Sequence, residues 1–433
     1  MPRAPDIPAT GSRTTTDPAR QAALRLLDLV LGEGRLLSDN AAAQLLAALE
    51  PADRARAQRL AAETLRGLER ADRLLDRHLR KRPALTGRNI LRMATVELAQ
   101  GGDAHGVVGA AVDLAAAEPR LARLKGLINA VLRKLAAEAP ARWSDLRIPR
   151  LPRWLRTRLI ETYGAGAVAA MERAHFRGAP LDLTARDDAA GLAAQTCGQV
   201  LPTGSVRLPA GVQVSNLPGF AAGAFWVQDA AAALPARVLA PRRGERVLDL
   251  CAAPGGKTLQ LAAAGADVTA LDLSQSRMAR LHENLRRTGL TASCVTGDAL
   301  SFAAPPFDAV LLDAPCSATG TIRRHPDLPH ARDGTGLAGL IDLQARLIDH
   351  ALTLLKPGGR LVVCTCSLLP EEGEHQAQAA LARHPELRTD AEALRLPGVD
   401  PDWIGHDGGL RLRPDCWPEM GGMDGFHIVC MRT

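Results

Sequence analysis

The feature that most constrains the fold is a regular alternation of strand-like and helix-like segments in the second half of the chain. From about residue 225, helical stretches separate most of a series of short apolar runs: RVLDL, DVTALDL, ASCVTG, FDAVLLD and RLVVCTC. Such alternation predicts a parallel sheet with helices on both faces. We therefore expect a Rossmann-like α/β domain over residues 225–433, with the last strand, FHIVCMR, antiparallel to its neighbours.

The first part of the chain has a helical pattern instead. An acidic residue followed by proline, Asp17-Pro18, is typical of a helix start, and helical spacing of apolar residues continues from there. This pattern predicts an all-α domain over residues 17–140, including one long segment from Ala52 to Leu79. Residues 141–224 are predicted to form a basic connector and a small α/β subdomain. Residues 1–16 are expected to form a flexible leader.

The charge is divided unevenly along the chain. Residues 1–180 hold 30 lysines and arginines against 19 acidic residues, whereas residues 181–433 hold 23 against 28. A basic half joined to an acidic half indicates that the first part binds a polyanion such as RNA. An arginine-rich, solvated helical surface is an equally good interpretation of the charge alone. With six Phe, five Trp and one Tyr, a base-stacking platform is disfavoured.

The composition also limits the compartment and the cofactors. No apolar run reaches the length of a membrane span, and residues 1–20 lack the apolar centre of a secretory signal. The eight cysteines have scattered spacings that indicate neither a disulfide framework nor a zinc site. We therefore expect a cytoplasmic protein that binds no metal and does not associate with membranes.

A glycine loop and three carboxylates predict a nucleoside site at one edge of the sheet. The strand RVLDL runs into CAAPGGKT, where Gly255 and Gly256 let the backbone approach a ligand. Asp272, Asp298 and Asp313 follow at the ends of the next strands. Each carboxylate alone could be a helix cap or a solvated loop residue, but three at successive strand ends favour a bound nucleoside. The loop lacks the first glycine of a phosphate-binding P-loop.

Two cysteines are predicted to lie at the same edge. Cys316 follows Asp313 by three residues, and Cys366 ends the fifth strand, which should neighbour the fourth. A cysteine thiolate can add to carbon 6 of cytosine, activate carbon 5 for methylation and then leave once a base removes the carbon-5 proton. The other strand cysteines, Cys251, Cys294, Cys364 and Cys430, are interpreted as small core residues. A redox pair of Cys364 and Cys366 is disfavoured by disulfide geometry.

The stretch from Phe225 to Glu372 resembles the Sun/Fmu family of RNA 5-methylcytosine methyltransferases. The matching pieces are FWVQDAAA, LDLCAAPGGKT, ALDLS, GDA, LLDAPCSATGTIRRHPD and TCSLLPEE, with DGFH near the end. The resemblance implies that the cofactor is S-adenosylmethionine. It also implies that Cys366 is the nucleophile and that Cys316 assists proton removal and product release.

The same resemblance assigns the cofactor site residue by residue. The residues that it implies are Cys251, Ala252, Ala253, Pro254, Gly255, Gly256, Lys257, Asp272, Asp298 and Asp313. Independently of the resemblance, Arg323 and Arg324 follow the Cys316 loop and are predicted to hold an RNA phosphate there, with a plain solvated loop as the alternative.

The helical part resembles the NusB antitermination fold, an RNA-binding domain. The matching pieces are RAQRLAAETLRG, LRMATVELAQ and INAVLRKLA, the last at residues 128–136. A NusB-like domain before the catalytic domain is similar to the bacterial small-subunit rRNA cytosine methyltransferase, which implies 16S rRNA as substrate. We also expect the enzyme to be a monomer. The alternatives are the same chemistry on tRNA or large-subunit rRNA, or a non-catalytic RNA-binding antitermination protein.

Overall fold

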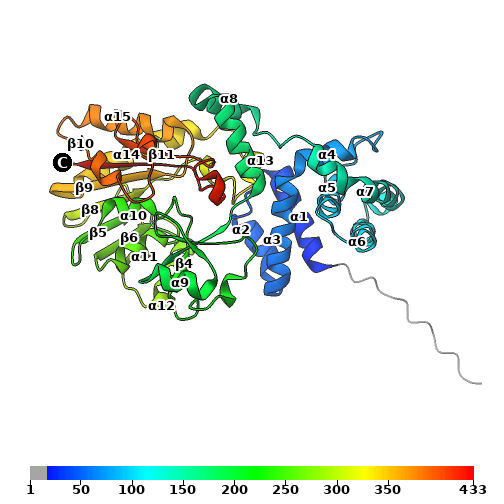
Figure 1. Cartoon of the computed structure of the whole chain (residues 1–433), viewed down its shortest axis with the longest axis horizontal. Helices are drawn as coiled ribbons and strands as arrows, with labels where there is room; N and C mark the ends of the chain where they lie inside the picture. The colour runs from blue at the N-terminus through cyan, green and yellow to red at the C-terminus, as the bar shows by residue number, and fades with distance from the viewer. Residues whose placement is uncertain (1–16) are drawn as a thin grey trace, which may run out of the picture. The chain divides into compact units, whose positions relative to one another are not determined.

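The computed structural model describes residues 17–433, and the chain divides into two compact units (Figure 1). The first unit ends at Pro149, and the second comprises Arg150–Thr433. The predicted leader, residues 1–16, lies outside the described residues. No helix within residues 17–433 is long and apolar enough to cross a membrane.

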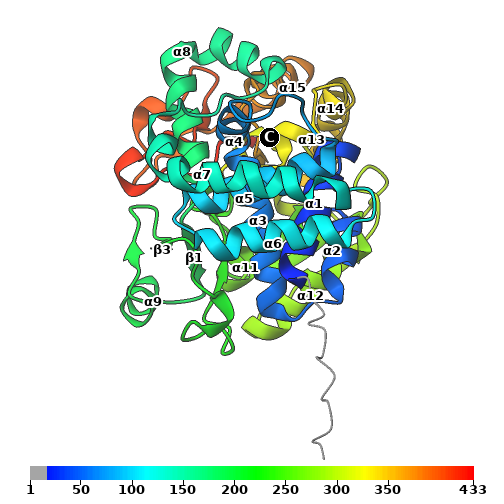
Figure 2. The same cartoon turned by 90° about the vertical axis from the view of Figure 1, so that its right-hand side faces the viewer.

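The first unit is built from α-helices, as predicted. They are α1 (Pro18–Glu33), α2 (Asn40–Ala47), α3 (Pro51–Arg66), α4 (Leu68–Leu75), α5 (Leu85–Ala99), α6 (Ala104–Ala117) and α7 (Lys125–Asp145). The Asp17 carboxylate caps α1 by accepting hydrogen bonds from the backbone N of Ala19 and Arg20. Helix α5 packs against five of the other helices and forms the centre of the core. Figure 2 shows α5, α6 and α7 side by side.

The segment predicted as one long helix from Ala52 to Leu79 is instead two helices, α3 and α4, which meet at Gly67. A Cβ atom on Gly67 would lie 2.9 Å from the Trp143 ring, so α7 packs closely against this junction. Beyond it, the Arg70 guanidinium donates to the carbonyl oxygens of Trp143, in the last turn of α7, and of Arg147, just after the helix. Helix α7 therefore continues to Asp145, past the predicted boundary at residue 140.

The second unit begins with helix α8 (Arg153–Arg177), which is kinked at Gly164, and a small antiparallel sheet. The strands of this sheet are β1 (Leu181–Ala185), β2 (Gln199–Val200), β3 (Val206–Leu208) and β4 (Phe225–Val227), in the order β2-β3-β1-β4, with α9 (Ala189–Thr196) between β1 and β2. Because β4 pairs with β1, this subdomain continues to Val227, slightly beyond the predicted boundary at residue 224.

The large sheet has the order β10-β12-β9-β8-β5-β6-β7, and β11 pairs with β12. Its strands are β5 (Arg246–Leu250), β6 (Asp267–Asp272), β7 (Ser293–Thr296), β8 (Phe307–Asp313), β9 (Leu355–Thr365), β10 (Arg388–Thr389), β11 (Gly409–Leu412) and β12 (Phe426–Arg432). Strands β5 to β9 pair in parallel, and β8 lies beside β9. The prediction that the last strand is antiparallel is confirmed, since β12 runs antiparallel to β9.

Helices cover both faces of this sheet, as the alternating pattern predicted. On one face, Val247 packs in a cluster with residues of α10 (Leu234–Leu239) and α11 (Gly256–Ala263). On the other face, its neighbour Leu248 packs in a cluster with residues of α14 (Leu337–Thr353) and α15 (Glu374–Arg383). The doubly covered sheet presents the carboxyl ends of its parallel strands at one edge.

Candidate active site

The loop between β5 and α11 turns sharply at this edge. The φ angles of Cys251 and Gly255 are 61° and 107°, both in the left-handed region. A Cβ atom on Gly255 would lie 2.2 Å from Cδ1 of Leu281, so only glycine fits there. Within the loop, Ala252 and Ala253 are buried and Pro254 is exposed.

Asp272, at the end of β6, ties the glycine loop to the sheet. Its buried carboxylate accepts hydrogen bonds from the backbone N of Ala253 at 3.1 Å and of Ser274 at 2.8 Å. It also pairs with Arg277 at 2.8 Å, whose side chain is 54% exposed and can therefore move away. Asp298 follows β7, where its carboxylate is exposed and accepts from the backbone N of Leu300.

Asp313, at the end of β8, pairs with the buried Lys257. Lys257 Nζ is 2.7 Å from Asp313 Oδ2, and Cys364 Sγ is 3.4 Å from Asp313 Oδ1. Burial lowers the pKa of Lys257, but the charge of Asp313 outweighs it, and the pKa is raised. The ammonium is therefore charged at neutral pH and neutralises Asp313 beside the loop.

Two thiols face each other at the ends of β8 and β9. Cys316 Sγ is 3.5 Å from Cys366 Sγ, and both side chains are half-buried. This separation exceeds the length of a disulfide bond, so both are free thiols. The hydrogen bond to Cys366, together with burial, raises the pKa of Cys316 well above its usual range. Cys316 is therefore a neutral thiol while Cys366 stands beside it.

The prediction that Arg323 holds an RNA phosphate is wrong. Its side chain is fully buried and donates to Asp229 at 3.0 Å and to the carbonyl oxygen of Gly421 at 2.6 Å. Asp424 lies 3.6 Å away, so the guanidinium neutralises two buried carboxylates instead of facing solvent. The neighbouring Arg324 is 39% exposed and pairs with Asp424.

Arg324 supplies positive charge close to the thiols. Burial lowers its pKa, but the charges of Asp424 and Asp229 outweigh that effect, and a Cys366 thiolate would raise the pKa further. The nearby backbone is also tightly packed, since a Cβ atom on Gly320 would lie 2.0 Å from the carbonyl oxygen of Gly425.

Sequence reasoning missed Glu372, which follows the second cysteine loop. Its side chain is buried and accepts hydrogen bonds from Ser317 and Ser367, the residues that follow the two thiols. The only signal in the sequence is the short spacing of this carboxylate from Cys366 in TCSLLPEE. Within residues 17–433, no group of three or more His, Cys, Asp or Glu side chains is arranged to hold a metal ion.

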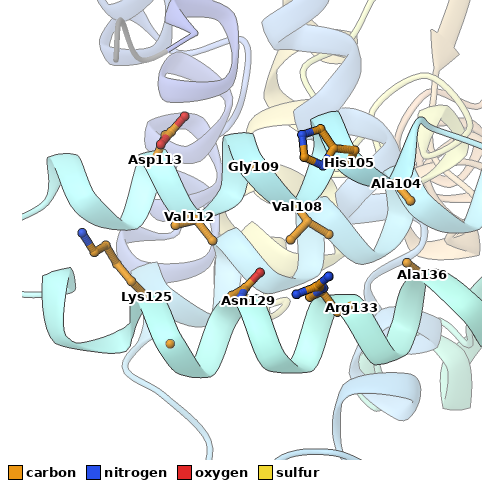
Figure 3. A pocket seen from close by; sticks show the side chains of 11 residues that line it. Ala104, His105, Val108, Gly109, Val112, Asp113, Lys125, Asn129, Arg133 and Ala136 are labelled. Carbon is orange, nitrogen blue, oxygen red and sulfur yellow. The ribbon is translucent and has the colours of Figure 1, made fainter. Parts of the chain in front are cut away.

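The helical unit carries a groove of about 700 Å³ between α6 and α7. Figure 3 shows Lys125, Asn129 and Arg133 along α7, opposite His105 and Asp113 of α6. The three α7 residues are four positions apart and therefore share one helix face. Lys125 and Arg133 are exposed and make no ion pair within residues 17–433.

Comparisons with known proteins agree with this architecture. The family model "16S rRNA methyltransferase RsmB/F" matches residues 236–432, and the NusB family model matches residues 17–137. The crystal structure of PH0851 has the same fold, with a TM-score of 0.73 over 100% of both chains at 22% identity. A methyltransferase homologue from Pyrococcus horikoshii covers 64% of this chain and 93% of its own, with 26% identity and a TM-score of 0.53.

The fold and these matches therefore define an S-adenosylmethionine-dependent rRNA methyltransferase with an N-terminal NusB-like domain. Ribosomal RNA small subunit methyltransferase B of Sodalis glossinidius is 39% identical over 320 residues, which are 68% of this chain and 72% of that protein. The protein of the same name from Vibrio cholerae is 37% identical over 350 residues, 76% of each chain. The chain belongs to the RsmB/F family of 16S rRNA methyltransferases.

Proposed function

We propose that this enzyme methylates carbon 5 of a cytosine in small-subunit (16S) rRNA through a covalent adduct between Cys366 and carbon 6. The observation that carries the proposal is the 3.5 Å separation of the Cys316 and Cys366 sulfur atoms at the edge that holds the glycine loop. The target base has to leave its stack, or be unpaired, to reach this edge. We place the reaction in the cytoplasm and take the enzyme to act as a monomer.

In this mechanism the two thiols act in sequence. The Cys366 thiolate forms a bond to carbon 6, and the electron pair of the 5,6 double bond shifts to make carbon 5 nucleophilic. S-adenosylmethionine, when bound, would supply an electrophilic methyl group to carbon 5 and leave as the thioether S-adenosylhomocysteine. Cys316 then removes the carbon-5 proton, and the electrons of that C–H bond form the 5,6 double bond and expel the Cys366 thiolate.

The pKa shift of Cys316 favours this order of events. Its largest cause is the hydrogen bond to Cys366, which is lost once the Cys366 sulfur is bonded to carbon 6. Loss of that hydrogen bond lowers the pKa of Cys316 at the stage where a base is needed, although burial and the charge of Glu372 still raise it. Before addition, the raised pKa keeps Cys316 from competing as a nucleophile.

We propose that the cofactor lies across the carboxyl edge of β5, β6, β7 and β8. The backbone of Cys251–Lys257 would line it, Asp272 would accept from the ribose hydroxyls and Asp298 from the adenine amino group, and Asp313 would complete the site beside Lys257. The exposed Asp298 carboxylate, and the open space around Gly297, support room for a ligand here. Release of Arg277 from Asp272 would free acceptor sites for the ribose.

Replacing Asp272 by alanine is expected to weaken binding of S-adenosylmethionine by roughly 2–4 kcal/mol, about 30- to 1000-fold in Kd. The variant loses the ribose contacts and leaves the Ala253 N–H without its partner. Titration calorimetry measures the effect. The matched control is Asp267→Asn at the exposed opposite end of β6, which should bind normally. Unchanged affinity in Asp272→Ala would refute the assignment.

We further propose that the helical unit provides most of the RNA affinity, with the groove between α6 and α7 holding the phosphate backbone. The unpaired Lys125 and Arg133 support this, because the phosphates of an RNA chain would neutralise them. The net positive charge of residues 1–180 also supports RNA binding by the helical unit.

A double variant, Lys125→Gln with Arg133→Gln, is expected to bind RNA more weakly and to reduce the slope of log K against log salt by about 1.4, or 0.7 for each lost single-strand contact. Filter binding across a salt series measures both quantities. Arg35→Gln with Lys81→Gln removes the same two charges from exposed positions outside the groove and is the control. Equal losses in the two double variants would show that the groove has no special part in binding.

The same chemistry on tRNA or large-subunit rRNA is the alternative substrate assignment. Bisulfite sequencing of total RNA from a strain that lacks the gene, compared with its parent, tests it directly. The expected result is the loss of one 5-methylcytosine from small-subunit rRNA. A loss confined to tRNA or large-subunit rRNA would replace this substrate, and no loss in any RNA would contradict cytosine methylation.

A further inference from the structure

A single buried carboxylate joins the two loops that carry the thiols. Glu372, in η4 (Pro370–Glu372), is 1% exposed. Its Oε1 accepts from the backbone N of Ser317 at 2.9 Å and from Gln344 Nε2 at 3.1 Å. Its Oε2 accepts from the hydroxyl groups of Ser317 and Ser367. A carboxylate accepts about four hydrogen bonds, so these donors occupy it fully.

The two serines are the residues next to the thiols in the chain. Ser317 follows Cys316 and Ser367 follows Cys366, so one side chain fixes the backbone beside both sulfur atoms. Direct contacts between the loops add to this: Thr319 Oγ1 is 3.2 Å from Ser367 Oγ, and the backbone N of Gly320 donates to the carbonyl oxygen of Cys366 at 2.9 Å. Glu372 is the charged member of this network.

We propose that Glu372 is a positioning residue that sets the separation of the Cys316 and Cys366 sulfur atoms. The inference rests on the proposed function for its catalytic consequence, because addition and proton removal occur at adjacent carbons and require the two thiols at a defined separation. Glu372 bonds both loops through groups that are themselves buried or half-buried, so water cannot readily replace it.

The charge of Glu372 has a second effect. After the hydrogen bond to Cys366, burial and the charge of Cys366, the negative charge of Glu372 is a further cause of the raised pKa of Cys316. Removing that charge without changing the shape of the side chain should therefore lower the pKa of Cys316. The rate of turnover should rise with pH as Cys316 loses its proton. Without the charge of Glu372, this rise should occur at lower pH.

Three substitutions separate these effects. Glu372→Ala removes the link between the loops. Glu372→Gln keeps its shape, since the amide oxygen can accept from Ser317 N and Gln344 while the amide nitrogen donates to the two serine hydroxyls. Glu371→Ala is the matched control, because Glu371 lies next to Glu372 in η4 but pairs with Arg158 at the surface.

The separation of the thiols can be measured without RNA by dibromobimane, which becomes strongly fluorescent when it links two neighbouring thiols. The full-length protein and Glu371→Ala should react equally fast, and Cys316→Ser gives the background. Glu372→Ala should react at least about 10-fold more slowly, and its kcat should fall about 100-fold, the scale of an ångström of misplacement. The KM for RNA and the Kd for S-adenosylmethionine should stay within about threefold.

Each outcome decides the proposal. Linking and turnover by Glu372→Ala at the rates of Glu371→Ala would overturn it. If Glu372→Ala does not fold, the double variant Ser317→Ala with Ser367→Ala decides, because it removes the two hydroxyl groups through which Glu372 binds the loops. Slower dibromobimane linking than in Glu371→Ala supports the proposal, and linking at the same rate overturns it. If the unmodified enzyme fails to methylate RNA while dibromobimane linking still depends on Glu372, the proposed function fails and the positioning role stands.

Discussion

Cys316→Ala is expected to convert the enzyme into one that captures its RNA covalently. Cys366 can still add to carbon 6 and carbon 5 can still take up the methyl group, but the group that removes the carbon-5 proton is missing. The adduct then persists, and turnover should fall by a factor on the order of 10² to 10⁴, the usual contribution of a general base. A denaturing gel should show a slow-migrating, denaturant-resistant protein–RNA band.

Two controls make this result specific. The double variant Cys316→Ala with Cys366→Ala should lose the band, because no thiol remains to form the bond. Cys294→Ala removes another half-buried thiol, from β7, and should turn over normally without a band. Normal turnover of Cys316→Ala with no adduct would mean that Cys316 is a structural thiol.

Cys366→Ala should have the largest effect on catalysis, because it removes the atom that forms the covalent bond. Methyl transfer should fall by about 10⁴-fold or more, the scale observed when a covalent nucleophile is removed. Binding of S-adenosylmethionine should be almost unchanged, because Asp272, Asp298 and the glycine loop are intact. Transfer of labelled methyl groups to RNA, with calorimetry for the cofactor, measures both quantities.

The same experiment distinguishes a chemical role from a structural one. Cys366→Ser keeps nearly the size of the side chain but carries a much poorer nucleophile, so it should be as inactive as the alanine variant while melting at the temperature of the unmodified enzyme. Methylation of RNA by either variant at a tenth or more of the normal rate would contradict a covalent role for Cys366.

The residues at the strand ends could be predicted from the sequence alone. Asp272, Asp313 and Cys366 each follow an apolar run, and the topology of a parallel sheet places the ends of such runs at one edge. The placement of Cys316 and Cys366 at the same edge follows from β8 and β9 being neighbours. Local pattern and topology were sufficient for that placement, whereas the 3.5 Å approach of the sulfur atoms also depends on the contacts between the two loops.

The features that could not be predicted depend on partners far away in the sequence. From the sequence alone, Arg323 is predicted to be a surface cation. The fold instead places it against Asp229 and Asp424, which lie far from it in the chain. The break between α3 and α4 depends on Trp143, which packs against Gly67 from another helix. In both cases the residue type is compatible with several environments, and tertiary packing selects one.

The placement of Asp424, Gly425 and β12 has a genetic consequence. All the residues proposed for catalysis and cofactor binding precede Glu372, yet Asp424 holds Arg324, Gly425 packs against Gly320, and β12 pairs with β9, the strand that leads to Cys366. A nonsense mutation at any codon from 373 to 424 would leave every one of those catalytic and cofactor residues encoded and still remove Asp424, Gly425 and β12, which pack against the thiol loops and β9. Such an allele should behave as a null allele, although a search for these motifs would score the gene as intact.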